Sequence, residues 1–99
     1  MKRINVLQVV GKNAVSMQSG SILHESIVSA LKEGGSVELD FNGIEIFASP
    51  FFNASIGLLL KDIDIDQLQE KIKLVNISDL GKGLLNQVVD NALVFYGKK

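Results

Sequence analysis

Few residues in this chain have the types and spacing that catalysis requires. His24 is the only histidine, and there is no cysteine to pair with it. No serine stands in the G-x-S-x-G motif that presents a hydrolase nucleophile. Glu38 and Asp40 share one face of a predicted strand and could form a catalytic pair of carboxylates. A strand face that contacts solvent explains the two residues equally well. Because no nucleophile, base and metal ligands come together in the pattern, the sequence predicts that the chain is not an enzyme.

Three aspartates have the alternate spacing with which a calcium loop begins, at Asp62, Asp64 and Asp66. Such a loop also needs a glycine at its sixth position and a glutamate at its twelfth. This chain has Gln67 and Lys73 at those positions. We therefore interpret the segment as a solvated acidic turn and expect no metal and no cofactor.

A glycine-rich segment after the last predicted strand suggests an anion site formed by Ser78, Gly81, Lys82 and Gly83. A phosphate-binding loop needs a glycine five residues before Gly81 and a serine or threonine after Lys82. Asn76 and Gly83 occupy those positions. A helix start with free N–H groups and a nearby lysine can still bind an anion or a nucleotide. The alternative, that the glycines let a helix pack closely on the sheet, fits the incomplete match better.

Composition limits the class of protein. The 99 residues fit one domain covering residues 1–99, and 46% hydrophobic with 21% charged residues is typical of a globular chain. A net charge of -1 provides no basic field for nucleic acid or an anionic membrane. No apolar run approaches the ~20 residues that span a bilayer. The lack of cysteine suits a reducing compartment, so we expect a cytoplasmic protein.

The strands are predicted from β-branched runs and from alternation. Ile4–Val10 is the first, Ser36–Phe41 the second and Ile72–Ile77 the last. The pair Asn42-Gly43 is a strong turn signal. It leads either into a hairpin with Ile44–Phe47 or into an extended crossing to the next helix.

The helices are predicted from their spacing and caps. Ser19 or Ser21 caps the first, which Gly34-Gly35 ends. Ser49-Pro50 begins a very apolar helix that runs to about Leu60, and a loop with a short helix follows over 62–71. Ser78 or Asp79 caps the last helix. Strands that alternate with helices predict an α/β fold, with about four strands in one parallel or mixed sheet and three to four helices packed on it.

The segment from Val37 to Leu60 resembles the core of STAS domains, the fold of bacterial anti-sigma-factor antagonists. There a strand of the form L-D-L-S-G-V-x-F-I precedes D-S-[S/T]-G and a helix, and this chain has VELDFNGIEIFAS before an apolar helix. The resemblance is closer to the STAS-like family of unknown function. Ser49 matches the motif serine, whereas Ala48, Pro50 and Phe51 replace its other three positions.

The resemblance implies a bacterial regulatory module without catalysis that binds a protein such as a histidine-kinase-like ATPase. In the antagonists that partner phosphorylates the motif serine, so Ser49 is either a phosphorylation site or only a helix cap. A homodimer through apolar faces is also possible, and small-anion or nucleotide binding at 78–83 is the alternative function. The predicted partner-binding residues lie on the apolar helix and the turn before it: Asn42, Gly43, Phe51, Phe52, Ser55 and Leu58.

Overall fold

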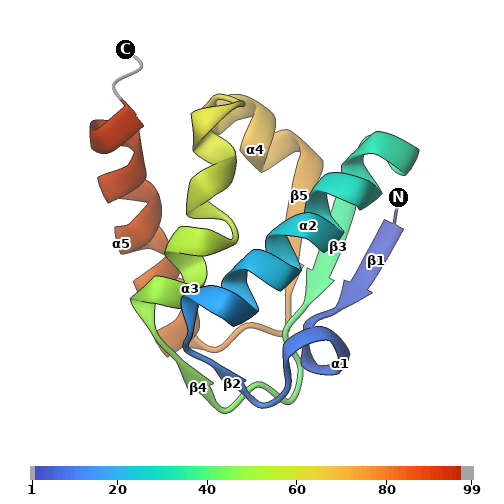
Figure 1. Ribbon diagram of the computed structural model, residues 1–99, viewed down its shortest axis with the longest axis vertical. Coiled ribbons are helices and arrows are strands. Elements are labelled where there is room, and N and C mark those ends of the chain that lie inside the picture. The colour runs from blue at the N-terminus through green and yellow to red at the C-terminus, as the bar shows by residue number, and fades with distance from the viewer. Residues whose placement is uncertain (1, 97–99) are drawn as a thin grey trace.

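Three parallel strands form the main sheet of the computed structural model, which describes residues 2–96. They are β1 (Lys2–Asn5), β3 (Val37–Asp40) and β5 (Ile72–Val75), in the order β1-β3-β5. A second sheet pairs β2 (Asn13–Ala14) with β4 (Ile46–Phe47), also in parallel. Figure 1 shows the two small sheets and the helices around them. The helices are α1 (Val6–Val10), α2 (Met17–Gly34), α3 (Ser49–Ala54), the 3₁₀ helix η1 (Gly57–Lys61), α4 (Ile65–Lys71) and α5 (Asp79–Tyr96).

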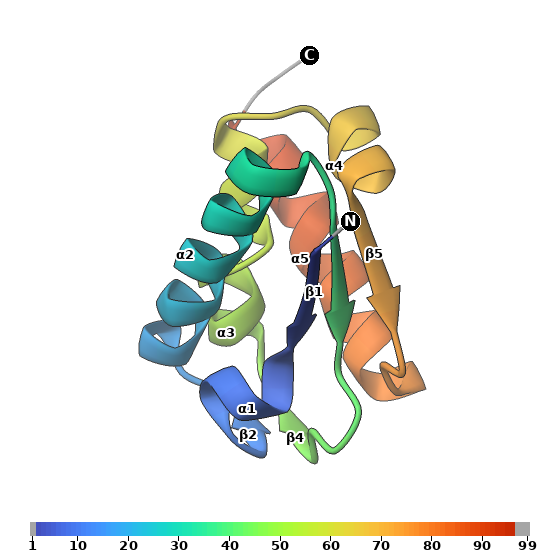
Figure 2. The ribbon, with the colours of Figure 1, turned by 90° about the vertical axis from the view of Figure 1, so that its right-hand side faces the viewer.

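The predicted α/β class is confirmed. The strands, which we expected in one sheet, divide into a sheet of three and a sheet of two among residues 2–96. Figure 2 shows α5 behind the main sheet and α2 and α3 beside it, and all three helices contribute buried residues to one core. No helix in the described part of the chain is long and apolar enough to cross a membrane.

The core lies between the sheet and these helices. Alternation along β3 turns Val37, Leu39 and Phe41 inward, where each is at most 1% exposed. Phe47 and Phe52 stack on each other with ring centroids 5.5 Å apart, and Phe41 lies within 6.3 Å of both. The aromatic cluster therefore joins the two sheets and α3.

The first predicted strand, Ile4–Val10, is wrong beyond Asn5. The side-chain Oδ1 of Asn5 accepts a hydrogen bond from the Gln8 N–H at 3.1 Å and so caps α1. A capping bond of this kind competes with strand formation, although the following residues are β-branched. Val6 then enters the core, and Gly11 ends the short helix with φ +84°.

Helix α2 begins earlier than either predicted cap. Ser16 is the N-cap, and its Oγ accepts a hydrogen bond from the Ser19 N–H at 3.0 Å. The predicted caps, Ser19 and Ser21, therefore lie inside the helix. The predicted end is confirmed, because Gly35 adopts the left-handed conformation with φ +78°.

The Asn42-Gly43 turn leads into a crossing and not into a hairpin. Gly43 has φ +90°, and the Ile44 N–H donates to the Phe41 carbonyl at 3.1 Å. The next strand, β4, pairs with β2 in parallel and not with β3. The sequence analysis predicted no strand at the two residues of β2.

The apolar helix predicted from Ser49 to Leu60 breaks after Ala54. The Ser55 Oγ donates to the Phe51 carbonyl at 2.8 Å, and His24 Nδ1 lies 2.9 Å from the Ser55 carbonyl oxygen. At Gly57 an added Cβ would lie 3.1 Å from a methyl group of Val88, so the chain approaches α5 closely there. These contacts replace the regular backbone hydrogen bonds of an α-helix, and the chain continues as η1.

The acidic turn is also part of a helix cap. Asp64 Oδ1 accepts a hydrogen bond from the Gln67 N–H at 2.9 Å, and Gln67 Oε1 accepts from the Asp64 N–H at 3.3 Å. This reciprocal pair forms a capping box at the start of α4. The predicted loop and short helix are confirmed, and residues 2–96 contain no cluster of histidine, aspartate and glutamate that could hold a metal ion.

Candidate functional site

Ser49 is the first residue of α3 and not its cap. Ala48 is the N-cap, in an extended conformation with φ -146° and ψ 154°, and no side-chain hydrogen bond caps the helix. The Ala48 N–H donates to the Ala14 carbonyl at 3.0 Å, which continues the β2–β4 pairing. Because this bond keeps Ala48 extended, the helix begins one residue later than the serine would need for capping. The prediction that Ser49 caps the helix is therefore wrong.

Three of the predicted partner-binding residues are core residues. Phe51, Phe52 and Ser55 are each 0% exposed. Phe51 and Phe52 pack edge to face with ring centroids 5.3 Å apart, and Ser55 donates its hydroxyl hydrogen to Phe51. A partner cannot contact these side chains in the folded protein, which corrects that part of the prediction.

The other predicted contact residues lie closer to the surface. Asn42 and Gly43 are exposed in the turn after β3, and Leu58 is half-buried on η1. Asn42 also donates its backbone N–H to Asp40 Oδ1 at 3.0 Å. The turn and η1 belong to different parts of the chain, and no described contact joins Leu58 to Asn42 or Gly43.

Three large exposed apolar side chains belong to segments that lie at the same end of the molecule as the start of α3. Met17 begins α2, Ile46 lies in β4 and Leu80 lies in the first turn of α5, with exposures of 65%, 52% and 67%. Figure 1 shows the starts of α2, α3 and α5 at the same end of the molecule as β2 and β4. Sequence periodicity could not reveal this set, because its members come from three separate segments.

The segment from Ser78 to Gly83 starts α5, as predicted. Ser78 Oγ accepts a hydrogen bond from the Gly81 N–H at 3.1 Å, and the Ser78 carbonyl accepts from the Lys82 N–H at 2.8 Å. A Cβ added at Gly81 would lie 2.9 Å from two ring atoms of Phe47, whereas Gly83 has open space around it. Gly81 therefore serves close helix packing, and its N–H is already bonded to the Ser78 side chain.

Asp40, at the end of β3, has a buried carboxylate that accepts three hydrogen bonds. Asp40 accepts hydrogen bonds from Arg3 Nη2 at 2.7 Å, Asn76 Nδ2 at 2.9 Å and the Asn42 N–H at 3.0 Å. The bond from Asn76 contributes most, followed by those from Asn42 and Arg3, and together they lower the pKa of Asp40 to about 2. Arg3 also forms an ion pair with Glu38.

This network ties the three strands of the main sheet together on the face away from the helices. Arg3 comes from β1, Asp40 from β3 and Asn76 from the residue after β5, where Asn76 adopts φ +59°. The sequence predicted that Glu38 and Asp40 share a strand face, and the register confirms it. It did not reveal Arg3 and Asn76 as partners, because they lie 37 and 36 residues away from Asp40.

The arrangement as a whole defines a small α/β domain with a parallel sheet, a serine at the start of the helix after β4, and exposed apolar side chains around that start. The chain belongs to the family described as the STAS-like domain of unknown function, whose family model matches residues 19–82. The match extends from α2 to the first turn of α5 and includes the whole segment that carried the sequence resemblance. No curated protein and no solved structure gave a significant match.

Proposed function

We propose that this protein is a non-catalytic, cytoplasmic regulatory module of bacteria that acts by binding another protein. The observation that carries the proposal is the exposure of Met17, Ile46 and Leu80 around the start of α3. We call these three side chains the Ser49-end surface. Single exposed apolar residues are common, but several on converging segments are typical of an interaction site.

The fold itself explains why two of these side chains point outward. Phe47 turns into the aromatic cluster, so its strand neighbour Ile46 must point to the other face of β4. Gly81 lies against the Phe47 ring, and its neighbour Leu80 points away from that contact. Burying a fully exposed side chain of this kind gains roughly 1.5–3 kcal/mol, so covering these three, which are 52–67% exposed, would contribute a few kcal/mol to a complex.

Phosphorylation of Ser49 is the regulatory part of the proposal. Ser49 is a half-buried residue, and its hydroxyl has no role in capping α3. A phosphate would add a charge of about −1.5 to −2 beside the Ser49-end surface. Because a docked partner would have to desolvate that charge, we expect phosphorylation to weaken the complex. The resemblance to anti-sigma-factor antagonists suggests a histidine-kinase-like ATPase as both partner and kinase.

Affinity isolation of the tagged protein from its own cells tests the proposal. We would compare the wild-type chain with Leu80→Glu and Ile46→Glu, and use Val94→Glu as the matched control. Val94 is 83% exposed on the same helix as Leu80 but far from its start. We expect one partner to be retained by the wild-type chain and by the control and to be lost from the two surface variants. Retention by all four chains would refute the assigned surface.

Site-resolved mass spectrometry of the same samples tests the regulatory part. A phosphorylated fraction of Ser49 that is enriched in the unbound protein would support a switch. If Ser49 stays unmodified in bound and unbound protein, the module binds its partner without that switch.

A further inference from the structure

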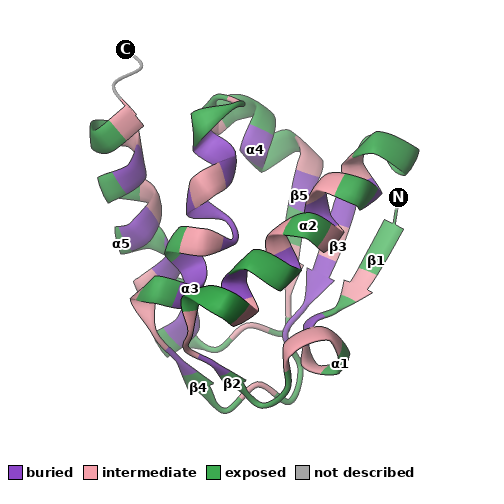
Figure 3. Cartoon of the chain, in the orientation of Figure 1, coloured by how far each residue is buried: buried purple, intermediate pink, exposed green. Residues whose placement is uncertain are grey.

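Strand β1 lies at an edge of the main sheet and leaves backbone groups open. The Lys2 N–H donates to the Ser36 carbonyl at 3.2 Å, so this group faces β3. Backbone groups alternate along a strand, so the N–H and C=O of Arg3 face the opposite side. Among residues 2–96 no strand pairs with that side. Figure 3 shows β3 largely buried and β1 largely exposed.

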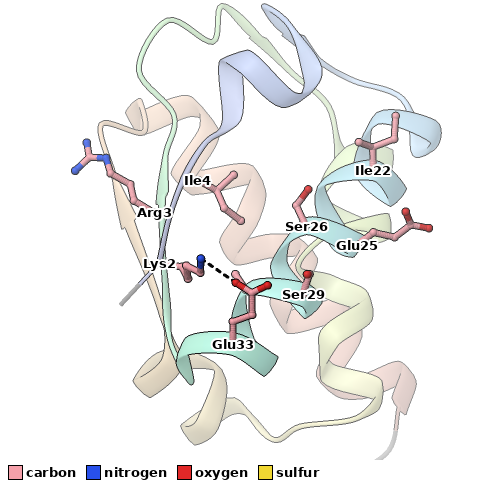
Figure 4. Close-up of a pocket in the computed structure, with 9 residues that line it drawn as sticks. Lys2, Arg3, Ile4, Ile22, Glu25, Ser26, Ser29 and Glu33 are labelled. Atoms are coloured by element: carbon pink, nitrogen blue, oxygen red, sulfur yellow. Dashed lines mark ion pairs between the residues drawn. The ribbon is translucent and has the colours of Figure 1, made fainter.

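A groove of about 480 Å³ runs between this open edge and α2. Figure 4 shows Lys2 and Ile4 on the strand side and Ser26, Ser29 and Glu33 on the helix side. The Arg3 side chain points away from the groove, toward Glu38 and Asp40 on the other face of the sheet. The groove therefore combines open backbone groups with two short serine side chains, which leave room for a further strand.

The charges along the groove are matched at one end only. Lys2 Nζ forms an ion pair with Glu33 at 2.8 Å, which raises the pKa of Lys2 and lowers that of Glu33. Farther along α2, Glu25 is exposed and makes no ion pair with any residue in 2–96. Ile22 also lines the groove and is 53% exposed. This part of the groove thus offers an unmatched negative charge next to an uncovered apolar side chain.

We propose that the groove binds an extended segment of another protein, which adds to β1 as a further strand. Its backbone would bond to the N–H and C=O of Arg3, as in other cases of strand addition. An apolar side chain would cover Ile4 and Ile22, and a lysine or arginine side chain would pair with Glu25. The groove shares no residue with the Ser49-end surface, so this binding activity is independent of the proposed function.

A second copy of this chain fits the edge less well than a foreign segment does. A two-fold pairing that uses both open groups of Arg3 places Arg3 opposite Arg3 of the copy. Each Arg3 carries two paired carboxylates, Glu38 and Asp40, so two clusters of net negative charge would face each other, and like charges opposite each other destabilise a strand pair. A shifted pairing would need the Asn5 carbonyl. That carbonyl belongs to the N-cap of α1 and accepts the first bond of the helix.

Selection from a displayed library of random ten-residue peptides on the immobilised protein tests the proposal. We expect selected peptides to carry an apolar residue near a lysine or arginine, and to bind Arg3→Ala but bind Arg3→Pro at least tenfold more weakly. Both variants lose the ion pairs of Arg3, but only proline removes the outward N–H. A proline at an edge position whose N–H faces solvent is compatible with a strand.

Two further measurements keep the proposal testable if Arg3→Pro fails to fold. Amide chemical shifts of the wild-type chain should change on peptide binding at Arg3, Asn5, Ile22 and Ser26, and Glu25→Lys should weaken basic peptides at least several-fold. The proposal is overturned if no peptide is selected, if the shifts change elsewhere, or if Glu25→Lys has no effect. It is also overturned if sedimentation shows a dimer that Arg3→Pro abolishes, because the edge would then serve self-association.

Discussion

The starts of α3 and α5 look alike in sequence and differ in structure. Each follows a strand, and each has a serine where a cap is expected. Ser78 accepts the Gly81 N–H and caps α5, whereas Ser49 lies inside α3 behind an uncapped Ala48. The comparison teaches that strand pairing decides which residue can cap, because the hydrogen bond from the Ala48 N–H to the Ala14 carbonyl sets the backbone conformation before the helix.

The two starts also differ in what they turn inward. The first turn of α3 places Phe51 and Phe52 in the core, and the first turn of α5 places only Gly81 there. Leu80 is consequently left at the surface. The start of α3 therefore contributes to the core, whereas the start of α5 leaves Leu80 exposed, where we propose that a partner binds.

The largest expected effect is that of Phe51→Glu, which places a charge in the core. Removing a buried phenylalanine side chain alone costs about 3–5 kcal/mol, and an unpaired buried charge adds to this. Because small domains have only about 5–15 kcal/mol of stability, we expect the variant to be largely unfolded. Leu80→Glu at the other start should stay folded. Circular dichroism with thermal unfolding would measure both, and a folded Phe51→Glu variant would contradict the assigned burial.

The next effect separates two glycines of the α5 start. Gly81→Ala should destabilise the protein by about 1–3 kcal/mol, since its Cβ would meet the Phe47 ring, which is held by its stacking on Phe52. Gly83→Ala should stabilise it by about 0.5–1 kcal/mol, because its surroundings are open. Urea unfolding would give both values. Equal effects at the two positions would argue against close packing of Gly81 on Phe47.

A smaller effect tests the caps directly. Ser78→Ala should cost about 1 kcal/mol, the usual value of a lost side-chain cap. Ser49→Ala should change the free energy of unfolding by less than about 0.5 kcal/mol, the usual range for a substitution that removes no such feature. Chemical denaturation of the two variants provides the comparison. If Ser49→Ala costs as much as Ser78→Ala, the two helix starts are equivalent after all.

The last effect depends on pH and concerns the segment that leads into α5. The segment before α5 is held by the bond from Asn76 to Asp40, whose pKa is lowered to about 2 from an ordinary value of 3.8. The lowered pKa contributes stability that is present above about pH 4 and is lost as the pH falls toward 2. Asp40→Asn should lack this component, so its stability should fall less steeply in that range. Parallel slopes for wild type and variant would contradict the assignment.

The sequence predicted best what depends on local signals. The alternation of Val37, Leu39 and Phe41, the end of α2 at Gly35 and the cap of Ser78 are all confirmed. Each rests on neighbouring residues, on glycine geometry or on a side chain that bonds to its own helix. The family resemblance, carried by the segment from Val37 to Leu60, is confirmed as well.

Predictions failed where distant segments decide the conformation. β2 is two residues long and exists because β4 pairs with it, so no local pattern could indicate it. The apolar helix after Ser49 breaks because Gly57 approaches α5 and His24 lies against the Ser55 carbonyl. The spacing of apolar residues alone had predicted that this helix continues to Leu60.

The sequence by itself therefore determined the α/β class and most of the helix and strand identities, because these follow from local propensity and from the alternation of apolar residues. Its motif resemblance indicated the family. Only the tertiary structure decided which apolar side chains at the helix starts are free and which polar side chains meet across the sheet. It buried Phe51 and Phe52, exposed Ile46 and Leu80, and brought Arg3 and Asn76 to Asp40. Burial and these contacts depend on packing between segments far apart in the chain, which local sequence patterns do not encode.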